Sequence, residues 1–140
     1  MYRARLHAWR DDRGAAVIEF ALIVPLLLLL LFGIIDMSRA FYTLNNLASA
    51  VREGARQAAV MSTDPSLVAN RAIVRATVTT AFMPIGQALR PESVKVEIDT
   101  VNGRPLRVRV TASYPYSPLV LPGQTILVRR NAIFRWEQSR

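Results

Sequence analysis

Few side chains in this 140-residue sequence could catalyse a reaction or bind a metal. Cysteine is absent and His7 is the one histidine. The sequence therefore offers no thiol nucleophile, no cluster of thiolate or imidazole metal ligands, and no Ser-His-Asp triad. The carboxylates that could act together are Glu97 and Asp99, which are two residues apart. Two carboxylates on one side of a strand could serve general acid–base chemistry.

The surrounding sequence indicates that each of these carboxylates faces an arginine. Apolar residues alternate with charged or polar ones over 94–99 and again over 107–112, which predicts two half-buried antiparallel strands. We expect Glu97 opposite Arg109 and Asp99 opposite Arg107. A carboxylate that faces a guanidinium stays ionised and is a poor general acid. We therefore expect no enzyme, no catalytic residue, no cofactor, no metal and no small-molecule substrate.

The alternation also predicts how the two strands pair. A two-residue turn at Asn102-Gly103 would set Ile98 opposite Arg107 and mix apolar with charged residues on one face. A loop with an odd number of residues, such as 102–104, keeps the two faces separate. It gives these pairs: Val94 with Ala112, Val96 with Val110, and Ile98 with Val108.

The longest apolar segment of the chain lies near its N-terminus. Phe20 to Ile35 are sixteen consecutive uncharged residues, and extending the segment back to Ala15 gives 21 residues with Glu19 as the one charge. At about 1.5 Å per residue such a helix reaches ~31 Å, enough to cross the hydrocarbon core of a bilayer. A cleaved secretory signal is the alternative, but its apolar core runs only about 7 to 15 residues. We therefore expect a retained transmembrane helix over 15–36.

The charges around this segment predict its orientation. Four arginines lie in the N-terminal segment 1–14, and the positive-inside rule keeps such a segment in the cytoplasm. We expect a basic cytoplasmic leader over 1–14, a single-pass helix in the inner (cytoplasmic) membrane, and an extracytoplasmic domain over 37–140. That domain would lie in the periplasm or outside the cell. The leader arginines are Arg3, Arg5, Arg10 and Arg13.

The rest of the sequence predicts a small α+β fold. The apolar periodicity continues beyond the membrane segment, so we expect one long helix from Ala15 to about Val60, amphipathic in its second half. Asp64 and Pro65 are typical of a helix start, which predicts a second helix over about 65–82. We expect residues 114–118 to form an extended loop because prolines cannot donate to a sheet ladder. A last strand over about 125–134 completes an antiparallel sheet of about three strands.

Several motifs together resemble a known family. The segment Gly14-Ala15-Ala16-Val17-Ile18-Glu19-Phe20 resembles the cleavage region of type IV prepilins, and the wider pattern resembles the TadE-like family of tight-adherence (Tad) pilus assembly proteins. The matching features are Gly14, Glu19-Phe20-Ala21, Pro25, residues 52–56 (Arg-Glu-Gly-Ala-Arg), and 108–110 leading into Tyr114-Pro115-Tyr116.

The resemblance implies a minor pseudopilin or pilus assembly protein that takes part in biogenesis of a Tad (type IVc) pilus. Its implied partners are the inner membrane, the Tad pilus machinery, other pilin-like subunits and a prepilin-type peptidase. The peptidase would cut between Gly14 and Ala15, although Ala15 is smaller than the bulky apolar residue that usually follows the cut. The resemblance assigns Glu19, Phe20 and Pro25 to assembly.

Physical chemistry gives two of these residues a specific task. A carboxylate inside a membrane is costly when alone, so Glu19 would either extend its side chain to the membrane edge or pair with the new α-amino group of Ala15 on a neighbouring subunit. We favour pairing because intramembrane carboxylates are uncommon and usually have a role. Pro25 removes one helical hydrogen bond and would kink or loosen the helix.

A second hypothesis follows from the net charge of +8. An exported single-pass anchor with a basic domain could bind polyanions such as DNA or surface polysaccharide. DNA binding usually places aromatic residues among the basic ones. Near the basic residues of the C-terminal part of the chain the aromatic residues that could do so are Tyr114, Tyr116 and Trp136. We therefore do not expect a nucleic-acid partner.

Overall fold

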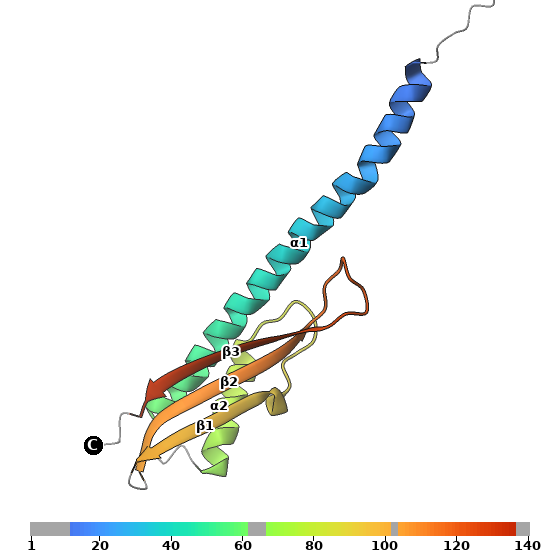
Figure 1. Ribbon diagram of the computed structural model, residues 1–140. Helices are drawn as coiled ribbons and strands as arrows, with labels where there is room; N and C mark the ends of the chain where they lie inside the picture. The colour runs from blue at the N-terminus through green and yellow to red at the C-terminus, as the bar shows by residue number, and fades with distance from the viewer. Residues whose placement is uncertain (1–11, 62–66, 102–103, 137–140) are drawn as a thin grey trace, which may run out of the picture.

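The computed structural model describes residues 12–61, 67–101 and 104–136. A single helix, α1 (Asp12–Ala59), accounts for 48 of these residues and is ~72 Å long at 1.5 Å per residue. Its first half extends away from the rest of the chain, and its second half packs against α2, β2 and β3 (Figure 1). The structure thus confirms one continuous helix over the predicted range, and the helix begins three residues before Ala15.

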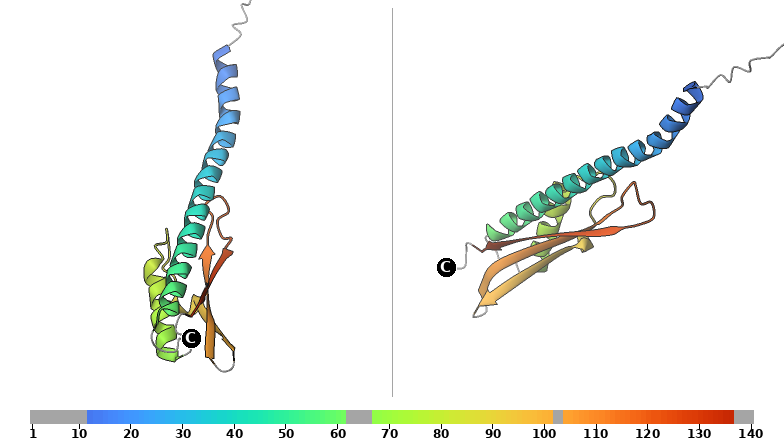
Figure 2. Two further views of the ribbon diagram at one scale, coloured as in Figure 1. Left: turned by 90° about the vertical axis from the view of Figure 1, so that its left-hand side faces the viewer. Right: turned by 45° about the horizontal axis from the view of Figure 1, so that its top comes forward.

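The remaining elements form a small antiparallel sheet with a second helix. They are α2 (Val68–Ala81), the short 3-10 helix η1 (Pro91–Ser93), β1 (Val94–Val101), β2 (Arg104–Tyr116) and β3 (Ile126–Arg135). The strand order is β1-β2-β3, with both pairs antiparallel. α1 contacts β2 and β3, while α2 contacts α1 and β1, so the two helices cover one face of the sheet (Figure 2). The α+β fold class is confirmed.

The core forms where the apolar face of α1 meets the apolar face of the sheet. On α1 this face combines Leu47 and Val51 with small alanines, and all of them are buried. The sheet contributes Val96, Val108 and Val110 from alternate positions of β1 and β2. Because successive strand residues point to opposite faces, the charged residues between them lie on the outer face.

Gly54 allows the two helices to approach closely. A Cβ atom added at this position would overlap the γ-methyl group of Val78 on α2. The glycine of the 52–56 motif therefore has a structural role in helix contact.

The predicted register of β1 and β2 is confirmed. Val96 pairs with Val110, and Glu97 pairs with Arg109. The predicted cause of this register is wrong, because β2 already begins at Arg104, which pairs with Val101. The extra residue is Leu106, which lies in a bulge between the pairs formed by Asp99 and Thr100.

The prediction that residues 114–118 form a loop is wrong over 114–116. These residues belong to β2, and Pro115 pairs with Leu127 of β3. β1 begins at Val94, the partner of Ala112, so beyond Ala112 the strand β2 has a neighbour on one side only. A proline is tolerated at such an edge because its missing N–H need not belong to a ladder. The predicted last strand is confirmed as β3, one residue later than expected at each end.

The predicted start of the second helix is also wrong. Leu67 has an extended backbone with ψ of 141°, and α2 begins at Val68 without a side-chain cap. Asp64 and Pro65, the predicted cap and first helical residue, lie outside the described residues. Val74 and Val78 of α2 are buried, whereas Leu67 is exposed.

Candidate functional site: the apolar helix and the polar cluster at its end

The first half of α1 is a long apolar surface that the folded domain does not cover. Its most apolar 18-residue window has a mean hydropathy of 2.8, and none of that window is buried. Leu22, for example, is 74% exposed. A core helix of a soluble protein would bury such side chains. By length and composition this is the one helix in the described part of the chain that could cross a membrane.

The residues predicted for processing and assembly all lie on this uncovered half of α1 (Figure 1). Gly14 and Ala15 are in its first turn, and Glu19 and Phe20 follow about one turn later, with exposed side chains. Pro25 lies inside the helix, which continues through it. Because proline has no N–H, the helix lacks one backbone hydrogen bond at this position. The structure places these residues along a single helix and away from the sheet.

A polar cluster marks the point where the apolar half of α1 meets the folded domain. Asp36 is only 8% exposed although it carries a carboxylate. The Tyr116 hydroxyl donates to the Asp36 carbonyl oxygen (2.9 Å) and to its Oδ1 (3.1 Å). The Val120 N–H donates to Asp36 Oδ2 (2.9 Å), and Arg39 Nη1 lies 3.5 Å from Oδ1. We call these four residues the Asp36 cluster.

The Asp36 cluster fixes the loop between β2 and β3 to the helix. A buried carboxylate is tolerated only when hydrogen bonds and charges satisfy its oxygens, and here both oxygens have partners. Burial raises the pKa of Tyr116, and its hydrogen bond to Asp36 raises it further, so the hydroxyl stays a neutral donor. The sequence analysis missed this cluster. The sequence feature that could have indicated it is Asp36, the first charged residue after the uncharged run.

A second contact fixes the other end of the same helical stretch. The Trp136 indole Nε1 donates to the Met61 carbonyl oxygen (3.0 Å), just beyond the end of α1. The Trp136 backbone N–H also donates to the Leu106 carbonyl oxygen (3.0 Å). The second half of α1 is therefore held to the sheet at both ends, by Asp36 and by the Trp136 contact.

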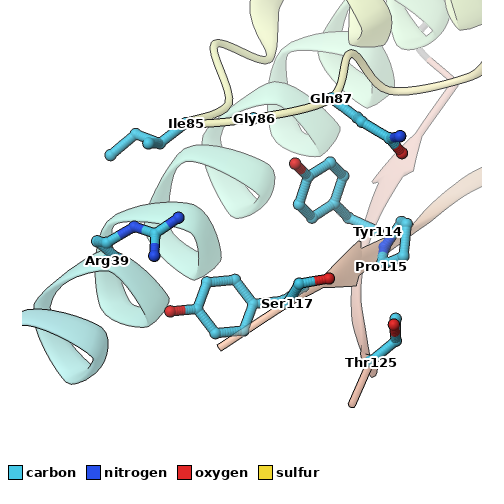
Figure 3. Close-up of a pocket in the computed structure, with 9 residues that line it drawn as sticks. Arg39, Ile85, Gly86, Gln87, Tyr114, Pro115, Ser117 and Thr125 are labelled. Carbon is cyan, nitrogen blue, oxygen red and sulfur yellow. The ribbon is translucent and has the colours of Figure 1, made fainter. Parts of the chain in front are cut away.

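A cavity of about 420 Å³ lies beside the Asp36 cluster (Figure 3). Its lining combines the Arg39 guanidinium with side chains from the loop after α2 and from the ends of β2 and β3, and Arg39 is the one charged residue among them. Within the described residues there is no group of three His, Cys, Asp or Glu side chains that could hold a metal. The lining residues are Arg39, Ile85, Gly86, Gln87, Tyr114, Pro115, Tyr116, Ser117 and Thr125.

The 52–56 motif presents an ion pair on the exposed side of α1. Arg56 Nη2 lies 2.5 Å from Glu53 Oε1, and its Nε donates to Glu53 Oε2 (3.1 Å). This bidentate pair faces solvent, while Gly54 between the two residues faces α2. The motif thus combines a helix contact on one side with a fixed charge pair on the other.

The outer face of the sheet has the charge arrangement predicted from the sequence. Glu97 is opposite Arg109 and Asp99 is opposite Arg107, as expected. Each carboxylate therefore has an arginine as its cross-strand neighbour.

Residues 14–56 match the family described as TadE-like protein. This segment begins at Gly14, includes Glu19, Phe20, Pro25 and Asp36, and ends at Arg56 of the ion pair. No curated protein and no solved structure matches the chain.

Proposed function

We propose that this chain, whose residues 14–56 match the family described as TadE-like protein, is a membrane-anchored minor pseudopilin or assembly protein in the biogenesis of a Tad (type IVc) pilus. One observation carries the proposal. The matched segment forms a single continuous helix that is apolar and uncovered in its first half and packed against a folded domain in its second. Such a helix suits a subunit that is held in a membrane while it presents a domain outside.

The proposed location is the inner membrane, with the N-terminus in the cytoplasm and the domain over 37–140 in the periplasm or outside the cell. The arginines of the segment 1–14 support this orientation. The uncovered apolar residues form an unbroken run from the first turns of α1 to Ile35 and continue on one side at Met37, Phe41 and Tyr42, while Asp36 begins the contacts with the folded domain. The lipid-spanning part and the domain therefore meet at Asp36.

Maturation and assembly are proposed to depend on the start of α1. A prepilin-type peptidase would cut the Gly14–Ala15 peptide bond and leave a helix that begins with a positive α-amino group. Glu19 is exposed one helical turn further along, so a neighbouring pilin-like subunit could bring its own N-terminal amine to this carboxylate. The intact mass of the protein from its own membrane tests the cut. The processed protein lacks residues 1–14, and a retained segment in cells with active peptidase would contradict it.

Affinity capture of the membrane-embedded chain followed by mass spectrometry tests the proposed function. We expect pilin-like subunits and Tad machinery to be captured with the wild-type chain. The Glu19→Gln variant should insert into the membrane but lose the pilin-like subunits, because it lacks the charge that pairs with their amines. Glu92→Gln is the matched control, since Glu92 is an exposed carboxylate outside α1. Capture of no pilus component by the wild-type chain would refute the proposal.

A further inference from the structure

The end of the folded domain nearest the apolar helix is poor in charge. The segments 40–51, 76–89 and 110–128 contain no Asp, Glu, Lys, Arg or His. Two loops from these segments, 82–89 and 117–125, lie beside α1 at this end (Figure 1). The Asn46 amide on α1 donates to the Met83 carbonyl oxygen of the first loop, and the Val120 N–H of the second donates to Asp36. Both loops are therefore fixed to the helix.

The Asp36 cluster sets the position of the second loop relative to the lipid. Asp36 directly follows Ile35, the last residue of the uncharged run. If the 21 residues over 15–35 fill the ~30 Å hydrocarbon core, Asp36 lies at its outer boundary. The bond from Val120 to Asp36 Oδ2 (2.9 Å) then holds the loop at the same boundary.

Apolar side chains project from this loop without protein cover. Leu119 and Leu121 flank Val120 and are 55% and 50% exposed. Ile85, from the first loop, is 51% exposed and lines the cavity that also contains residues 116 and 117. Burial of exposed leucines in the interface between headgroups and acyl chains is favourable, because it removes apolar surface from water.

We propose that the loop over 117–125 is a second membrane contact, in which Leu119 and Leu121 enter the lipid interface of the outer leaflet beside α1. This inference rests on the proposed function, because it requires α1 to span the bilayer. Lipid is the occupant because the leucines continue the uncovered apolar surface of α1. The domain then lies against the membrane in a fixed orientation.

Fluorescent labels on single cysteines test this contact, because the chain has no native cysteine. Leu119→Cys and Leu121→Cys would each carry a polarity-sensitive fluorophore on the full-length chain, in bilayers of phosphatidylcholine and phosphatidylglycerol. Val101→Cys is the matched control: Val101 is also apolar and 54% exposed, but it lies at the end of β1 remote from the apolar half of α1 (Figure 1). Leu28→Cys marks the membrane-spanning part of the helix.

We expect a blue shift of the emission, and quenching by brominated lipid, at positions 119, 121 and 28 but not at 101. If the labels at 119 and 121 behave like the label at 101 while position 28 is quenched, the second membrane contact is refuted and the membrane anchor stands. If the label at position 28 is also unquenched, the proposed membrane-spanning function itself fails.

Discussion

Removing the hydroxyl of Tyr116 should loosen the loop between β2 and β3 by a predictable amount. The hydroxyl is buried and donates to both the carbonyl oxygen and the carboxylate of Asp36. A hydrogen bond to a charged group contributes about 1.5 to 3 kcal/mol. The Tyr116→Phe variant keeps the ring and the Val120 bond, so we expect a loss near the middle of this range, about 2 kcal/mol. At 25 °C that loss corresponds to an opening equilibrium shifted about 30-fold.

Hydrogen exchange of the Val120 amide measures this change directly, because its N–H is bonded to Asp36 Oδ2 and exchanges when the loop opens. In the full-length chain in bilayers, we expect this amide to exchange about 30-fold faster in Tyr116→Phe than in the wild type. Tyr42→Phe is the control, because Tyr42 lies on α1, as Asp36 does, but its side chain is 47% exposed. Equal exchange at Val120 in the two variants would show that the Asp36 cluster does not hold the loop.

Two further predictions concern stability. Gly54→Ala should lower the free energy of unfolding by about 1 to 3 kcal/mol, because its methyl group would overlap Val78; denaturant titration should show no such loss for Gly33→Ala, where the added Cβ meets nothing within 4 Å. Burial and the bond to Asp36 raise the pKa of Tyr116, so its contribution is complete below its ordinary pKa of about 10 and is lost as the pH rises through the raised value. Protease resistance of the loop should fall over that alkaline range as tyrosinate absorbance appears, and resistance that persists after ionisation would contradict this reasoning.

The sequence predicted the elements with strong periodicity and missed the contacts between distant residues. The apolar run and the alternation around Val96 and Val110 were sufficient for α1, the sheet and the register, because each pattern acts within a few residues. The pairing of Asp36 with Tyr116 joins residues 80 positions apart, and no local pattern indicates such a contact. Asp36 therefore carried only a weak signal, as a charge at the end of an apolar helix.

The mistaken predictions arose where tertiary context overrides a local rule. Pro115 would interrupt a central strand, but it lies where β2 has a partner on one side only, a condition set by where β1 begins. Leu106 supplies the odd residue of the register inside a strand, where a bulge leaves no distinctive sequence. The roles proposed for Gly14 in processing and Glu19 in assembly stay predictions, because they involve partners outside this chain.

The most direct test of the proposed function is the number of Tad pili on cells that lack this protein. Electron microscopy of the deletion strain should show loss of surface pili, and expression of the wild-type chain should restore them. A chain without residues 15–35 should fail to restore them, because it has no membrane anchor. Normal piliation in the deletion strain would contradict a role in pilus biogenesis.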